Sequence, residues 1–146
     1  MKAGLKKTDI IISTDRRKLQ TGKIHKFLTE AYWSKGISAG RVKKAIAGSI
    51  CFGVYLKKKQ IGFARVISDK TSLAYIADLF IIEEYRGRGL SKLLVKSILN
   101  HHELSEVKAW MLATKDAHGL YAKFGFKALS EPAKFMRMQN PKPAAE

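Results

Sequence analysis

Cysteine is nearly absent from this chain, and acidic residues are scarce. The single cysteine, Cys51, excludes an intramolecular disulfide and a cysteine-cluster metal site, and no spacing of His, Cys and Asp is typical of metal ligands. No apolar run is long enough to span a membrane, and the basic start lacks the apolar stretch of a signal peptide. These absences predict a metal-free protein of the reducing cytoplasm, without membrane attachment.

The length and composition are those of a globular protein with a hydrophobic core. The chain has 146 residues, of which 46% are hydrophobic and 27% charged. It shows no internal repeat and no linker, so we predict a single domain over residues 1–139. Residues 140–146 contain two prolines and are expected to form a disordered tail.

The shortage of acids leaves a large positive charge. There are 28 Lys and Arg residues against 12 Asp and Glu, a formal net charge of +16. We favour a solvated basic surface as the explanation of this charge, and the alternative is an anionic partner. A nucleic-acid-associated basic module is therefore one alternative function, although no helix-turn-helix, zinc finger or RNA-binding aromatic motif is present to support it.

Apolar periodicity predicts an α+β order of elements. Strands are predicted at Asp9–Thr14, Ser49–Leu56, Ile61–Ile67, Leu73–Ile82, Val107–Ala113, Phe126–Leu129 and Lys134–Met138, and helices at Thr21–Trp33, Ala39–Ala47, Leu90–Leu99 and Ala117–Phe124. Ser38 and Asp116 are candidate N-caps, and Gly125 is placed to follow the last helix. Leu73–Ile82 is apolar on both faces, so it is expected inside the sheet.

A basic, glycine-rich loop joins that strand to the next helix. The loop, Tyr85-Arg86-Gly87-Arg88-Gly89-Leu90, lets the backbone turn sharply where the helix begins. Free N–H groups and the helix dipole favour an anion there, and Lys92 adds another positive charge. The spacing fits neither a P-loop nor a dinucleotide fingerprint. A pyrophosphate group is therefore the expected ligand of this loop.

Two motifs carry a resemblance to a known family. Arg-Gly-x-Gly-Leu-Ser after a strand resembles motif A of the GNAT acetyltransferases, and Thr114–Phe126, with its Ala-x-x-Leu-Tyr-x-x-x-Gly-Phe pattern, resembles motif B. The resemblance implies a mixed, mostly antiparallel central sheet with splayed middle strands, flanked by about four helices. It also implies acetyl-CoA as the acyl donor and direct acetyl transfer to a primary amine.

The resemblance also assigns residues to the cofactor. It implies that the pantetheine arm contacts Leu79, Phe80 and Ile81 on the strand. The pyrophosphate is then expected on the loop and the first helical turn, at Arg86, Gly87, Arg88, Gly89, Leu90, Ser91 and Lys92. Thr114 stands where the family often has an asparagine, and its hydroxyl offers fewer hydrogen-bond donors to the cofactor.

Two residues are candidates for proton transfer. Tyr121 matches the tyrosine of the family, and a phenol carries a proton that it can donate to the leaving thiolate. Asp78 is the single acid within an apolar strand and is the leading candidate for the base. The alternative for Asp78 is a structural acid bonded to the backbone or to a basic neighbour.

Tyr32 and Trp33 follow the first predicted helix in a region that, in this fold, borders the acceptor site. We expect these aromatic side chains to shape the acceptor pocket, which would receive a small-molecule or peptide amine. Besides the nucleic-acid alternative, an acyl-CoA-binding sensor without turnover remains open. The sequence leaves the acceptor and the oligomeric state open, and it is compatible with a dimer.

Overall fold

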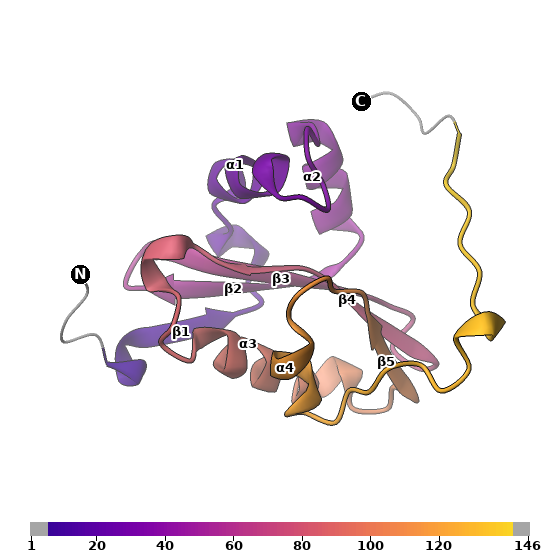
Figure 1. The fold of residues 1–146 in the computed structure, drawn as a ribbon. Helices are drawn as coiled ribbons and strands as arrows, with labels where there is room; N and C mark the ends of the chain where they lie inside the picture. Colours follow the sequence, from indigo (N-terminus) through magenta and orange to yellow (C-terminus); the bar gives the residue numbers. More distant parts are fainter. Residues whose placement is uncertain (1–5, 142–146) are drawn as a thin grey trace.

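The computed structural model describes residues 6–141 of the chain. Its centre is a sheet of five strands in the order β1-β2-β3-β4-β5, shown in Figure 1. Neighbouring strands are antiparallel except β4 and β5, which are parallel. The strands are β1 (Ile10–Ser13), β2 (Ile50–Leu56), β3 (Lys59–Ser68), β4 (Leu73–Ile81) and β5 (Ala109–Leu112).

Four α-helices cover the two faces of the sheet. α1 (Thr21–Glu30) and α2 (Ala39–Ala47) lie over one face, and α3 (Leu90–Leu99) and α4 (His118–Ala122) over the other (Figure 1). Short 3-10 helices occupy Lys7–Asp9, Arg16–Lys18, Glu83–Tyr85, His102–Leu104 and Pro132–Lys134. The predicted α+β fold with a mixed, mostly antiparallel sheet is confirmed. No helix in the described part of the chain combines the length and apolar character that a membrane span requires.

Each face of the sheet has its own apolar core. Leu90, Leu94 and Ile98 repeat at helical spacing on α3 and are buried with side chains of β2, β3 and β4. On the other face, the buried side chains of α1 and α2 enclose Phe63 and Phe80. Each fully buried aliphatic or aromatic side chain stabilises the fold by about 1.5–3 kcal/mol. The sheet is thereby packed between the two helix pairs.

The local signals at helix ends are only partly as predicted. The Ser38 hydroxyl accepts a hydrogen bond from Arg41 N at 3.1 Å, so the predicted cap of α2 is confirmed. The predicted cap at Asp116 is wrong, because α4 has no side-chain cap. Instead, the Thr114 hydroxyl accepts from Ala117 N at 3.0 Å in the turn before the helix.

The pairing of β4 with β5 is short, and this opens the sheet. Paired residues extend only from Leu73 with Ala109 to Ile76 with Leu112, whereas β4 continues to Ile81. The second half of β4 therefore has β3 on one side and no strand on the other among the described residues. A β-bulge lies in that half: Asp78 has φ +55°, and the pairing with β3 shifts between Phe63 and Arg65.

The two predicted closing strands are wrong. Residues 126–129 and 134–138 form no strand, and the part of the chain from 127 to 141 is exposed at every residue. In Figure 1 this C-terminal segment, drawn in yellow, leaves the body of the molecule beyond β5. Of the tail predicted to be disordered, residues 142–146 lie outside the described part of the chain.

Candidate active site

The glycine-rich loop adopts the conformation that an anion site requires. Gly87 and Gly89 have φ of +76° and +78°, which side-chain-bearing residues rarely adopt. Gly89 is the N-cap of α3, so the first turn of a ten-residue helix directs its free N–H groups towards the loop. Arg86 donates a hydrogen bond from Nε to the Ile81 carbonyl at 2.9 Å. This bond ties the loop to the end of β4.

A cavity of about 240 Å³ lies beside this loop. It extends from the start of α3 to α4, on the side where β4 has no neighbouring strand. Seven residues predicted to bind the cofactor are among those lining it. The lining consists of Ile81, Tyr85, Arg86, Gly87, Gly89, Leu90, Ser91, Lys92 and Leu120. Leu79, Phe80, Arg88 and Thr114 were also predicted as cofactor residues but do not line it.

Lysines from three separate segments meet around the loop. The ammonium group of Lys123, just after α4, lowers the pKa of Lys92 on α3, because the two cations are close together. The Lys7 Nζ lies 3.8 Å from the position that a Cβ on Gly89 would take. Sequence reasoning missed Lys7 and Lys123, since only the fold brings them to the loop. Together with Lys92 they form a concentration of positive charge suited to a polyanion.

Tyr121 is held in a buried position on α4. Its side chain is 7% exposed, and its ring meets Phe126 edge-on at 5.7 Å between centroids. Gly125, at φ +97°, turns the chain so that Phe126 N donates to the Tyr121 carbonyl at 3.3 Å. Burial, with a smaller contribution from Tyr32, raises the pKa of Tyr121 to about 12. The phenol therefore keeps its proton at neutral pH.

Asp78 is bonded to two side-chain donors. Its Oδ1 accepts from Trp33 Nε1 at 2.8 Å, and its Oδ2 accepts from Arg65 Nε at 2.6 Å. Arg65 also donates to the Ser49 hydroxyl at 3.1 Å. The carboxyl side chain is 10% exposed, so this is a largely buried ion pair. These contacts favour the alternative interpretation of Asp78, a structural acid paired with a basic neighbour.

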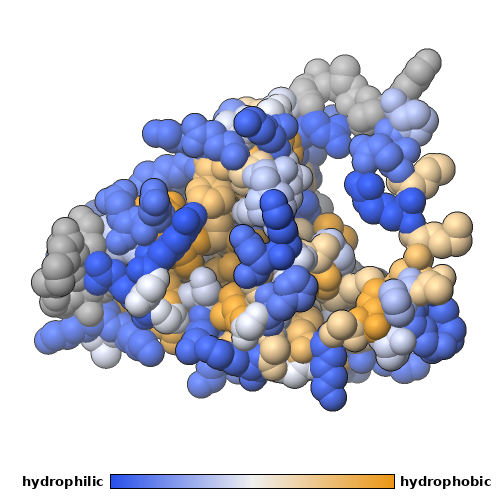
Figure 2. Space-filling model, viewed as in Figure 1, coloured by the Kyte–Doolittle hydropathy of each residue, from blue (hydrophilic) through white to orange (hydrophobic). Residues whose placement is uncertain are grey.

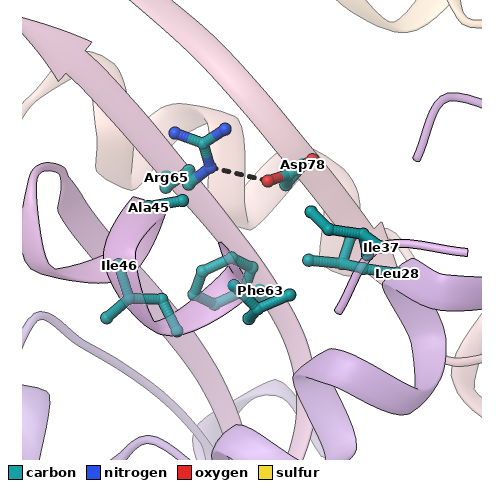
Figure 3. A pocket seen from close by; sticks show the side chains of 8 residues that line it. Leu28, Ile37, Ala45, Ile46, Phe63, Arg65 and Asp78 are labelled. Atoms are coloured by element: carbon teal, nitrogen blue, oxygen red, sulfur yellow. Dashed lines mark hydrogen bonds and ion pairs between the residues drawn. The ribbon is translucent and has the colours of Figure 1, made fainter. Parts of the chain in front are cut away.

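Figure 3 shows that pair at the end of a small cavity between α1, α2 and the sheet. The other side chains that line the cavity are apolar, and Leu28, Ile46 and Phe63 are among them. Its volume of about 10 Å³ gives room for at most one water molecule. The space is too small for an acceptor molecule.

The loop after α1 connects both sides of the opening in the sheet. The Tyr32 hydroxyl accepts from Lys115 N at 3.2 Å, in the segment that follows β5. Trp33 donates to Asp78 on β4, and the two aromatic rings meet edge-on at 5.1 Å. Tyr32 and Trp33 are 55% and 44% exposed. The structure thus brings four predicted residues, Tyr32, Trp33, Asp78 and Tyr121, to one region.

The comparisons agree with this architecture. The family description "Acetyltransferase (GNAT) domain" matches residues 47–128, more than half of the chain. A crystal structure from Xanthomonas campestris pv. campestris, described as an acetyltransferase of the GNAT family, is 41% identical with a TM-score of 0.87 and covers 90% of this chain and 94% of its own. A Gibberella zeae protein named as an acetyltransferase is 28% identical over 137 residues, 79% of this chain and 77% of its own.

A further structure shares the fold at low identity. It is an acetyltransferase from Clostridium acetobutylicum, determined with acetyl-CoA, with 12% identity and a TM-score of 0.67, and it covers 89% of this chain and 96% of its own. The family match over residues 47–128 contains the glycine-rich loop, β4 and Tyr121. The chain belongs to the GNAT family of acetyltransferases.

Proposed function

We propose that this enzyme transfers an acetyl group from acetyl-CoA directly to a primary amine. The observation that carries the proposal is the loop of Gly87 and Gly89, with both residues at positive φ, opening on a 240 Å³ cavity beside the unpaired half of β4. A pyrophosphate suits the N–H groups of α3. The Clostridium acetobutylicum relative contains acetyl-CoA in the same fold, which supports this donor.

The unpaired half of β4 suits the pantetheine arm. Amide groups of that arm are hydrogen-bond donors and acceptors, and a strand edge without a neighbour offers the complementary groups. Leu79, Phe80 and Ile81 lie on this half of β4, and Ile81 also lines the cavity. Pyrophosphate on the loop and pantetheine along β4 would direct the thioester towards Asp78, Trp33 and Tyr121.

The reaction requires one bond to form and one to break. The amine nitrogen attacks the thioester carbonyl carbon, the carbon–sulfur bond breaks, and the sulfur leaves as a thiolate. In our proposal Tyr121 donates its phenolic proton to this sulfur, because its raised pKa of about 12 keeps the phenol protonated, and water then returns a proton to the phenolate. The amine loses its proton to solvent water. Tyr32 and Trp33 border the entry route of the amine.

The test is release of free thiol from acetyl-CoA with a panel of amines. Tyr121→Phe removes one hydroxyl and is expected to lower kcat by about 100-fold or more while coenzyme A affinity stays near wild type. Tyr75→Phe, on the half of β4 that pairs with β5, is the matched control and should retain full turnover. Wild-type kcat in Tyr121→Phe would show that the phenol is not the acid.

Two other outcomes separate the alternatives. Coenzyme A binding without turnover on any amine would indicate an acyl-CoA sensor. Failure of calorimetry to detect coenzyme A binding by the folded chain would refute the donor assignment altogether. The panel should span small amines, amino acids and peptide N-termini, because the net charge of +16 disfavours only strongly cationic acceptors.

A further inference from the structure

A lysine is held against an aromatic ring at the opening in the sheet. The Nζ atom of Lys115 lies 5.5 Å from the centre of the Tyr32 ring. The backbone N–H of the same lysine donates to the Tyr32 hydroxyl at 3.2 Å, which joins the segment after β5 to the loop after α1. Because an aromatic face attracts a cation, these two contacts hold both the backbone and the ammonium group of Lys115 beside Tyr32.

This ammonium group has no anionic partner within the part of the chain that the structure describes. No carboxylate of that part lies within ion-pair distance of Lys115. Asp116, the next residue, is exposed to solvent. Asp78 already accepts hydrogen bonds on both oxygens, one from Trp33 and one from Arg65, the second of which is drawn in Figure 3. A molecule that enters here therefore meets a positive charge that is still to be neutralised.

The hydroxyl of Tyr32 adds a second hydrogen-bond donor beside this charge. A phenol oxygen can accept one hydrogen bond and donate another. The oxygen of Tyr32 accepts from Lys115, and its own proton is donated to no group among the described residues. The side chain is 55% exposed, so a ligand can reach it. An ammonium group and a hydroxyl on one ring suit a carboxylate, which accepts hydrogen bonds on two oxygens and carries the opposite charge.

This pair of donors lies close to the residues proposed for the chemistry. Burial, and to a smaller extent Tyr32, raises the pKa of Tyr121, so the two phenols are near each other. The Tyr32 ring also meets the Trp33 ring edge-on at 5.1 Å, and Trp33 donates to Asp78. A carboxylate bound by Lys115 would therefore lie near the reacting amine, and both groups can belong to one small molecule.

The surrounding surface favours the same kind of molecule. Figure 2 shows mainly hydrophilic side chains on this face, with hydrophobic ones exposed between the layer of α1 and α2 and the layer of α3 and α4. Trp33 is 44% exposed and adds an aromatic surface beside Tyr32. The net charge of +16 attracts anions at long range and raises the rate at which they reach the protein.

Building on the function proposed above, we propose that the acceptor is an amino acid or a close analogue, a small molecule with a carboxylate near its primary amine, and that Lys115 and Tyr32 bind this carboxylate. The Lys115 ammonium group and the Tyr32 hydroxyl each donate to one carboxylate oxygen, while the rings of Tyr32 and Trp33 contact the rest of the molecule. The product is the N-acetyl amino acid, formed by the bond changes already described. Lys115 determines specificity and takes no part in proton transfer.

The first test compares amino acids with their amides. Thiol release from acetyl-CoA is measured with glycine and glycinamide, and with phenylalanine and phenylalaninamide. Each kcat/KM is expressed per concentration of neutral amine, because the two amines of a pair differ in pKa. The wild type should prefer the carboxylate form by about tenfold or more. Equal use of the two forms, or preference for the amide or for a diamine, would refute the carboxylate site.

Substitutions at two lysines locate the contact. Lys115→Met should lower the ratio of kcat/KM for the acid to that for the amide by about tenfold or more, whereas Lys115→Arg, which retains the charge, should keep most of it. The matched control is Lys108→Met, which removes the same charge from an exposed side chain at the other end of β5. An unchanged ratio in both methionine variants would show that Lys115 does not bind the carboxylate.

A binding measurement separates this site from the proposed reaction. Calorimetry with N-acetylphenylalanine and N-acetylphenylalaninamide, with and without coenzyme A, should show about tenfold tighter binding of the acid, lost in Lys115→Met. If that preference appears but no amine is turned over, the carboxylate site stands and the proposed transfer fails. If amines are turned over but acid and amide bind equally, the transfer stands and the site is refuted. Binding of neither ligand also refutes the site.

Discussion

Gly87→Ala tests the anion loop directly. Gly87 has φ +76°, a conformation that costs a side-chain-bearing residue about 1–2 kcal/mol. A Cβ at this position meets no atom of the protein within 4 Å, so the loss of stability is conformational and not steric. At about 2.1 cal/mol/K of unfolding entropy per residue, this corresponds to a fall in Tm of about 3–7 °C for a chain of 146 residues.

The same Cβ points into the space where a ligand would approach the backbone. If the pyrophosphate lies against the N–H groups of the loop, the extra methyl should weaken coenzyme A binding by about tenfold or more, equivalent to about 1.4 kcal/mol. The matched control is Gly36→Ala, since Gly36 has φ +79° and an equally open Cβ position after α1. It should lose the same stability and keep wild-type affinity.

Thermal unfolding and calorimetry on the two variants separate the effect on stability from the effect on coenzyme A binding. Equal losses of Tm show that both substitutions impose the same backbone strain. A coenzyme A affinity that falls only in Gly87→Ala then assigns the cofactor to the loop. If both variants bind coenzyme A as tightly as wild type, the close approach of the pyrophosphate to this backbone is refuted, whatever the activity of the enzyme.

Three further predictions concern proton transfer and stability. The kcat of the wild type should show no decline as the pH rises just above neutral, because the raised pKa of Tyr121 keeps the phenol protonated there; a decline near neutral pH in a pH–rate profile would contradict its role as the acid. Arg65→Met should cost about 3–5 kcal/mol in urea unfolding, because it leaves the Asp78 carboxylate buried without its cation, and adding Asp78→Asn should recover much of that loss. Leu94→Ala, at a side chain that is 0% exposed in the core, should cost about 2–5 kcal/mol in the same assay, and a loss below about 1 kcal/mol would contradict the burial.

Periodicity and turn chemistry predicted most of the regular structure. The bounds of α2 and α3 agree with the predicted ranges, because apolar residues repeat at helical spacing and Ser38 and Gly89 mark the starts. The prediction of a strand at residues 134–138 was wrong, because it rested on local sequence alone. Alternation shows only that a segment is suited to pairing, and no strand of the described part of the chain pairs with this one. A local pattern carries no information about where a partner strand is.

The candidate site was only partly visible in the sequence. The loop could be found because its glycines precede a helix directly, but Lys7 and Lys123 come from distant segments. The ion pair of Arg65 with Asp78 could have been predicted from the sequence. Arg65 is the one charged residue of the predicted strand Ile61–Ile67, and Asp78 is the one charged residue of the predicted strand Leu73–Ile82. Adjacent strands of a hairpin bring such residues together. The bulge at Asp78 gave no signal in the sequence, because the alternation of side chains along a strand does not reveal an inserted residue.

The contacts of Asp78 bear on the route of the amine proton. Both carboxylate oxygens already accept hydrogen bonds, from Trp33 and Arg65, and the same contacts fix the bulge and the loop that carries Tyr32. A base that took up the proton would weaken both the ion pair with Arg65 and the hydrogen bond from Trp33 that joins this loop to β4. Tyr121, for its part, retains its proton and can serve only as the acid. The geometry therefore favours an acceptor that loses its proton to water, with Asp78 as a positioning residue. In that case the rise of kcat/KM with pH should follow the pKa of each amine in the panel rather than one value common to the enzyme.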